Sequence, residues 1–229
     1  MDLAILNKIL QQHQQWIDSK GQSGKKAILE KAVLINIELN NADLQGISLI
    51  GSDLSEASLQ RVNLQFANLV KANFNQVSLF RSNLNYADMA GISLQSADLR
   101  FCLLKGVNLL GANLEGANLQ YAELREADAT FANFSGADLY GANLKRTNFH
   151  SAFFEKANLS ATNMQYANLS YCTFPKANMS SSSLFKAELE GAIFHGADLR
   201  YVTIDYDNLQ YLPEPELQRY QETFIVIPN

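Results

Sequence analysis

The sequence predicts an all-β solenoid, and three columns of residues with a period of five predict it. The first column runs from Leu29 to Leu209 without an insertion, and its 37 positions hold 26 Leu, six Phe, three Met, one Ile and one Ala. Ala or another compact residue stands two positions earlier, and Asn or Asp most often fills the place between. The repeating unit is therefore A-(N/D)-L-x-x, where x varies freely.

A period of five excludes the two regular secondary structures. A helix turns about 100° per residue, so leucines five apart would spread around the whole cylinder. A flat strand alternates its faces, so an odd period would send successive leucines to opposite sides. A chain that bends after each short extended piece can instead point every fifth side chain at one axis. Asn and Asp support such bends because their side chains bond to nearby backbone groups.

The phenylalanines of the leucine column indicate how many units make one coil. Five of the six are separated by multiples of twenty residues: Phe74, Phe134, Phe154, Phe174 and Phe194. Four units per coil would stack the last four as one aromatic ladder, whereas three units would scatter them. We therefore predict a four-sided coil whose core contains this ladder and the axial leucines, among them Leu69, Leu114 and Leu119.

Units such as Ala67-Asn68-Leu69 and Ala137-Asp138-Leu139 resemble the signature A(D/N)LXX of the pentapeptide repeat family. The resemblance covers about residues 27 to 211 and implies a right-handed quadrilateral β-helix. In that fold the central residue and the preceding Ala point inward, and the other three positions point outward. With about 4.8 Å between stacked strands, 37 units imply about nine coils and a rod of about 45 Å.

The two ends of the chain lack the repeat and are predicted to cover the open ends of the solenoid. Residues 1–26 contain an amphipathic segment over 2–18, with Asp2 as its N-cap, so we expect a capping helix and a linker. Such a helix could also lie on a membrane, but Lys8 is its only basic residue before Lys20, so capping is favoured.

Residues 212–229 are predicted to be a capping or dimerising tail after the repeats of residues 27–211. Pro213 and Pro215 stop the coil, a short helix is expected over residues 215–222, and an apolar stretch follows from Phe224 to Ile227. The tail either folds back over the last coil or pairs with a second copy. We favour folding back, and therefore a monomer over a homodimer.

The sequence offers no chemistry for catalysis, so we expect a protein that is not an enzyme and that needs no cofactor or metal. Its three histidines lie far apart, no metal-ligand spacing occurs, and Cys102 and Cys172 take places in the compact inward column. No run of 18 apolar residues and no signal peptide pattern is present. These observations predict a cytoplasmic protein with no membrane partner.

The outward positions that depart from the repeat are the candidates for a protein-binding surface. Four places hold aromatic residues in pairs one coil apart: Phe66, Tyr86, Phe101 and Tyr121. Three basic residues form a vertical row: Lys105, Arg125 and Lys145. The rings either cover corners of the coil or contact a partner, and the row is either a solvated face or a site for acidic partners.

A long ordered surface without a catalytic site predicts a non-enzymatic interaction module, a cytosolic regulatory or scaffold protein whose partner is an unidentified protein. Direct nucleic-acid binding is not expected, because the net charge of −5 would repel phosphates. The family resemblance implies two alternatives: a DNA mimic that binds DNA gyrase and confers quinolone resistance, or a regulator of heterocyst differentiation in cyanobacteria. The mimics are strongly acidic and interrupted by loops. This chain has no interruption and carries 18 acidic and 13 basic residues over the repeats.

Overall fold

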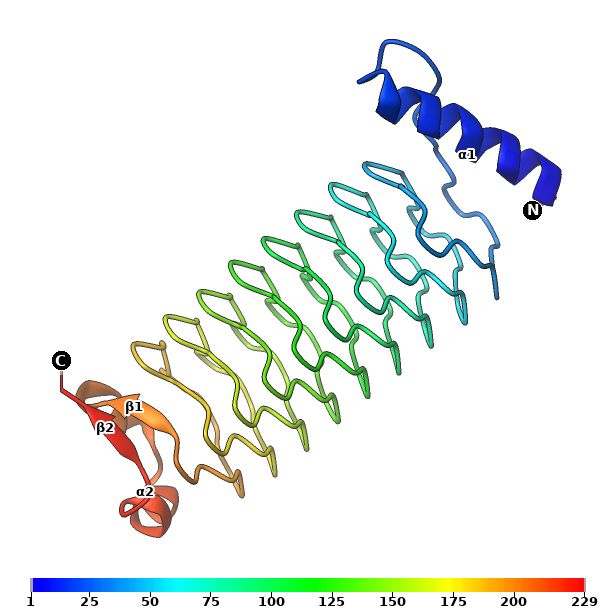
Figure 1. The fold of residues 1–229 in the computed structure, drawn as a ribbon. Helices are drawn as coiled ribbons and strands as arrows, with labels where there is room; N and C mark the ends of the chain where they lie inside the picture. The colour runs from blue at the N-terminus through cyan, green and yellow to red at the C-terminus, as the bar shows by residue number, and fades with distance from the viewer. Residues whose placement is uncertain (1, 229) are drawn as a thin grey trace.

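The solenoid predicted from the sequence is confirmed in the computed structural model, which describes residues 2–228 (Figure 1). Similar coils stack along a rod that has helix α1 (Leu3–Asp18) at one end and the short C-terminal elements at the other. Parallel bridges join residues twenty positions apart, from Ile28 with Ser48 to Ser183 with Thr203. One coil therefore takes four pentapeptides.

Backbone hydrogen bonds repeat in each pentapeptide and leave little of the polar backbone unpaired. The N–H of Asn118 donates to the carbonyl of Ala97 in the preceding coil, and the N–H of Leu119 donates to Asp138 in the following one. Within the corner, the N–H of Ala117 donates to the carbonyl of Leu114. The residue at each corner has a positive φ, such as 58° at Tyr121, which lets the chain turn without breaking this ladder.

The Asn and Asp column supports the corners, as the sequence predicts. The side-chain Oδ1 of Asn63 accepts a hydrogen bond of 3.2 Å from the backbone N–H of Gln65, two residues later. The side-chain Nδ2 of Asn63 donates to Oδ1 of Asp43, one coil earlier, at 2.9 Å. The same two bonds recur along the rod, so this column both holds the turns and ties neighbouring coils together.

The predicted core residues all lie inside the rod. Leu69, Leu114 and Leu119 are buried at the axis. The rings of Phe134, Phe154, Phe174 and Phe194 stack with centroids 5.0 to 5.1 Å apart and planes within 9° of parallel. The ring of Phe149 meets the rings of Phe134 and Phe154 edge-on, at 5.6 and 5.3 Å. Aromatic contacts of both kinds stabilise the second half of the core beyond simple burial.

Helix α1 lies across the N-terminal end of the first coil (Figure 1). Its N-terminus is capped by Asp2, whose carboxylate accepts the N–H groups of Ala4 and Ile5 at 2.8 and 3.2 Å. Leu6 is buried in the common core, and Nδ1 of the buried His13 accepts the N–H of Ala27 at 3.1 Å. Burial lowers the pKa of His13, which favours the neutral ring that this bond requires.

The C-terminal tail lies against the last coil of the same chain. Strand β1 (Thr203–Asp205) is followed by a 3-10 helix (Tyr206–Tyr211), helix α2 (Glu214–Tyr220) and strand β2 (Ile225–Ile227). Strand β2 pairs in parallel with β1, so that Thr203 lies opposite Ile225. The hydroxyl of Tyr220 donates to the carbonyl of Ala197 at 3.2 Å.

Two boundaries differ from the sequence-based expectation. Leu209, expected in the last repeat, lies in the 3-10 helix, because Asp205 caps that helix by accepting the N–H of Asn208 at 3.2 Å. The side chain of Asn208 then reaches back to the carbonyl of Ala187 at 2.8 Å. Helix α2 begins one residue earlier and ends two residues earlier than the expected range of 215–222.

Candidate interaction surface

The four aromatic candidates form two stacks on corners of the coil. The rings of Phe66 and Tyr86 are 5.6 Å apart and within 9° of parallel, and those of Phe101 and Tyr121 are 5.2 Å apart and within 11°. All four residues occupy corner positions with positive φ, and between 42% and 56% of each is exposed to solvent. Each ring therefore shields part of its stacking partner from solvent, and the rest of its apolar surface faces outward.

Each stack ends on a glycine in the next coil. A Cβ atom added to Gly106 would lie 2.7 Å from the ring of Tyr86, and one added to Gly141 would lie 2.8 Å from the ring of Tyr121. Both glycines have a positive φ and leave room for the ring to lie flat over the corner. The rings consequently act in part as corner covers, which was one of the two interpretations of the sequence.

The two stacks flank one wall of the rod, which we call the basic wall. It comprises the two corners and the side between them in seven successive coils: residues 61–66, 81–86, 101–106, 121–126, 141–146, 161–166 and 181–186. The wall has two carboxylates, Glu123 and Glu126, and seven cations: Arg61, Arg81, Lys105, Arg125, Lys145, Arg146 and Lys186. The basic row predicted from the sequence lies in the third to fifth of these coils, in the turn beside the corner that carries Tyr86 and Tyr166. All seven candidate residues therefore come together on this wall.

Most cations of the basic wall have no carboxylate partner. Lys105 Nζ lies 3.4 Å from Glu126 Oε2, and Arg125 Nε lies 3.2 Å from Glu123 Oε2. Within residues 2–228, the other five form no ion pair. Lys145 and Arg146 instead lie over the ring of Tyr166, at 5.5 and 5.7 Å from its centroid. These cations remain available to an acidic partner.

A cluster of arginines and rings at one edge of the wall was missed in the sequence. The guanidinium of Arg81 lies 5.2 Å from the centroid of Phe80 and 5.7 Å from that of Phe101. Arg100 lies 5.3 Å from Phe80 and pairs with Asp98 at 2.7 Å, a hydrogen bond that lowers the pKa of the Asp98 carboxyl. The sequence signal for this cluster is the pair Phe80-Arg81, which lies one coil before Phe101, at spacings of 21 and 20 residues.

The middle of the basic wall is hollowed. A depression of about 510 Å³ is lined by Asn85, Leu103, Lys105, Glu123, Arg125 and Asn143. Leu103 takes a place in the Asn and Asp column and is 43% exposed, so it gives the depression an apolar spot between charged side chains. A leucine in the Asn and Asp column is visible in the sequence, but it was not used to predict this surface.

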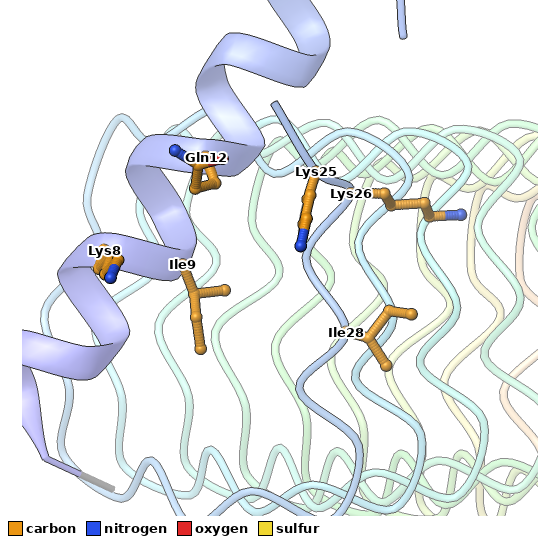
Figure 2. A pocket seen from close by; sticks show the side chains of 6 residues that line it. All are labelled: Lys8, Ile9, Gln12, Lys25, Lys26 and Ile28. Atoms are coloured by element: carbon orange, nitrogen blue, oxygen red, sulfur yellow. The ribbon is translucent and has the colours of Figure 1, made fainter. Parts of the chain in front are cut away.

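A second hollow lies between helix α1 and the first coil (Figure 2). Its volume is about 520 Å³, and the residues that line it are Lys8, Ile9, Gln12, Lys25, Lys26 and Ile28. The lining offers positive charge and apolar surface but no carboxylate, thiol or imidazole. It therefore has no pair of groups for acid-base or nucleophilic chemistry.

Groups that could support other functions are scattered in the described part of the chain. No three His, Cys, Asp or Glu side chains within residues 2–228 are placed to hold a metal ion. None of the helices in the same range has the length and apolarity that crossing a bilayer requires. The outward polar side chains bond within their own corner, as Asn63 does to Gln65, or to the neighbouring coil, as Asn63 does to Asp43.

The two cysteines are expected to be unreactive while the protein is folded. Cys102 and Cys172 are buried, and each Sγ donates to a carbonyl of the preceding coil, of Leu79 and Phe149, at 2.9 Å. Burial raises the pKa of both thiols to about 12, so the reactive thiolate is scarce near neutral pH. A thiol reagent such as DTNB should label neither cysteine in buffer and both in denaturant. Rapid labelling of the native protein would contradict this placement.

Comparison with known proteins places the chain beside other proteins built from pentapeptides. Residues 25–56, 57–95, 92–128, 130–165 and 162–200 match the family described as Pentapeptide repeats, in eight copies. No curated protein matches the chain.

Three of the similar solved structures are described as follows. HetL, a pentapeptide repeat protein involved in heterocyst differentiation regulation from Nostoc sp. strain PCC 7120, is 26% identical over 82% of this chain and 94% of its own, with a TM-score of 0.38. QnrB1, a plasmid-mediated fluoroquinolone resistance protein, is 15% identical over 84% and 99%, with a TM-score of 0.52. A pentapeptide repeat protein from the thylakoid lumen of Arabidopsis thaliana is 28% identical over 44% and 68%, with a TM-score of 0.30. The likeness to QnrB1 supports the fold alone.

Proposed function

Because the chain belongs to the pentapeptide repeat family, we propose that it is a non-enzymatic module that binds another protein and acts as a cytoplasmic regulator or scaffold. The observation that carries the proposal is the gathering of two exposed aromatic stacks and a row of cations on one wall. Tyr, Phe and Arg are enriched at protein interfaces, and a regular wall presents them without a cost of ordering loops. The candidate binding residues remain Phe66, Tyr86, Phe101, Tyr121, Lys105, Arg125 and Lys145.

We propose the following architecture for the module. Residues 27–211 would form a right-handed quadrilateral β-helix of about nine coils. Residues 1–26 would cap its N-terminal end, and residues 212–229 would cap its C-terminal end. The pairing of β2 with β1 supports a capping role for the tail, because it covers a strand edge that a second copy would otherwise use. We therefore favour a monomer, and sedimentation that shows a tight dimer would contradict it.

The proposal is tested by comparing what the protein and two variants bind. Phe101→Ala with Tyr121→Ala removes one aromatic stack of the basic wall. Phe131→Ala removes a corner ring that is 55% exposed and lies outside this wall. The tagged proteins are incubated with native cell extract, and bound proteins are identified by mass spectrometry.

We expect the wild type and Phe131→Ala to capture the same partner and the double variant to lose it. Removing an interfacial aromatic anchor commonly costs about 2 kcal/mol or more, which is about thirtyfold in affinity. Capture that survives equally in both variants would show that the stack on this wall is not the binding surface. Circular dichroism of all three proteins checks that the solenoid is intact.

The alternatives have less support. A DNA mimic needs an extended acidic face. The wall with the exposed rings carries seven cations and two carboxylates, and the repeats as a whole mix 13 basic with 18 acidic residues. Unchanged supercoiling by DNA gyrase in the presence of the protein would dismiss this alternative. A role in heterocyst differentiation depends on the family resemblance, and no residue on the wall favours it over another regulatory role.

A further inference from the structure

The charge of this protein is unevenly distributed, because the basic wall has the opposite sign to the whole chain. The wall carries seven cations and two carboxylates, a net charge of +5, while the whole chain carries −5. The remaining residues together therefore carry −10. A concentration of one sign against the net charge of a protein creates a local field that steers oppositely charged partners.

The spacing of the cations restricts the shape of such a partner. Lys105, Arg125 and Lys145 follow one another at one coil, which is about 4.8 Å along the rod. Glutamates three or four residues apart on a helix are separated by about 4.5 to 6 Å along its axis and lie on one face. Alternate residues of a strand are separated by about 6.7 Å, which differs from the spacing of about 4.8 Å between the cations, so side chains of a strand would no longer lie opposite the cations after two coils.

The geometry points to an acidic α-helix of a partner protein that lies along the rod on the basic wall. This inference rests on the proposed interaction function and specifies the partner that the wall fits. The glutamates of such a helix would face Lys145, with Arg81 and Arg146 at the two corners, all three without an ion pair among residues 2–228. The glutamates would also compete with Glu126 for Lys105 and with Glu123 for Arg125. The exposed side chain of Leu103, in the central depression, provides an apolar contact for one leucine of the helix.

The corners of the wall would guide the helix along the rod axis. The stack of Phe101 and Tyr121 stands on one corner, and Tyr86 and Tyr166 stand on the other. Between them the side chains are mostly short amides and cations, which provide hydrogen-bond donors. A helix between two rows of rings buries its apolar flanks while its charged face meets the cations, which is the arrangement of a desolvated hot spot.

Nucleic acid fits the same wall less well. Asp43 continues the Asn and Asp column of the wall one coil before its start, so a polyanion longer than the seven coils would meet a carboxylate there. The other walls carry the remaining negative charge and would repel a long polyanion. A short acidic helix covers only the basic coils and avoids this repulsion.

The inference is tested with a synthetic helical peptide as the probe. The peptide is acetylated and amidated, with Glu at positions i, i+4, i+7 and i+11 of one face and one Leu among them. A second peptide has Gln in place of Glu, and a third has the same composition with its Glu residues distributed around the helix. Binding is followed by fluorescence anisotropy, together with a labelled DNA duplex as an alternative ligand.

Two double variants of the full chain separate the basic wall from general charge effects. Arg125→Glu with Lys145→Glu reverses two cations one coil apart on the wall. Lys156→Glu with Lys176→Glu reverses two cations one coil apart on a corner of the rod away from the wall. Both variants change the net charge of the protein by the same amount.

We expect the one-faced Glu peptide to bind the wild type in the micromolar range at low salt and more weakly as salt increases. The wall variant should weaken binding at least about tenfold, and the control variant less than about twofold. The Gln and redistributed peptides should bind at least about tenfold more weakly than the first. Equal binding of all three peptides, equal loss in both variants, no binding, or tighter binding of the duplex would overturn the inference.

The failure of this inference and that of the proposed function give different results. If capture of the natural partner depends on Phe101 and Tyr121 but the Glu peptide does not bind, the interaction function stands and the acidic helix is wrong. If no variant changes what is captured and the peptide does not bind, both are wrong.

Discussion

Replacing Phe154 by alanine is expected to lower the free energy of unfolding by about 3 to 5 kcal/mol. The ring is fully buried and stacks between Phe134 and Phe174, with centroids 5.1 and 5.0 Å away, while Phe149 meets its edge at 5.3 Å. An alanine would leave a cavity in the core. The neighbouring coils cannot move inward to fill it, because each coil is stacked on the next. Urea unfolding followed by circular dichroism measures the change.

The neighbouring residue provides a matched control for this prediction. Phe153 lies one position earlier, points outward and is 47% exposed, so Phe153→Ala should change stability by no more than about 0.5 kcal/mol. Phe154→Leu restores the usual residue of the column and should cost less than the alanine variant, because most of the volume returns. Equal losses for Phe153→Ala and Phe154→Ala would show that the ladder does not hold the core together.

The period of the sequence predicts the interior of this protein well for a physical reason. An uninterrupted five-residue repeat specifies which side chains point inward in every coil, so one rule places Leu69, Leu114 and the phenylalanine ladder. The corner role of Asn and Asp follows from side-chain chemistry that is local and independent of the rest of the fold. At these positions the local turn preference of the residues and the packing of the whole solenoid favour the same structure, and such agreement makes a fold predictable.

The surface was predictable in part. The row of Lys105, Arg125 and Lys145 follows from counting by twenty, but Arg81 and Phe80 were missed, because the direction in which a corner side chain leans depends on its neighbours rather than on the period. The tail lies beyond the repeat, so the sequence favoured its folding back without identifying β1 as the strand with which it pairs. Outside the repeat, the sequence predicted the two helices from local signals, but not the strand pairing of the tail.

Replacing Gly24 by alanine is expected to detach helix α1 from the first coil. A Cβ atom at this position would lie 2.3 Å from the carbonyl oxygen of Gln12 and 2.5 Å from the backbone N of Trp16, and Gly24 has a φ of +74°. Both close atoms belong to the backbone of α1, so neither can move away as a flexible side chain would. The chain then has to separate from the helix, which breaks the hydrogen bond from Ala27 to His13.

The single tryptophan makes this detachment measurable, because Trp16 lies on α1 and stacks on His13 with ring centroids 5.7 Å apart. We expect Gly24→Ala to shift Trp emission to longer wavelength in native buffer, while the circular dichroism of the coils persists. Gly111→Ala is the matched control, since Gly111 also has a positive φ, of +62°, but nothing lies within 4 Å of its added Cβ. It should cost about 1 kcal/mol from backbone strain and leave the emission unchanged. An unchanged emission in Gly24→Ala would mean that the helix tolerates the added methyl group and is not held by this close approach.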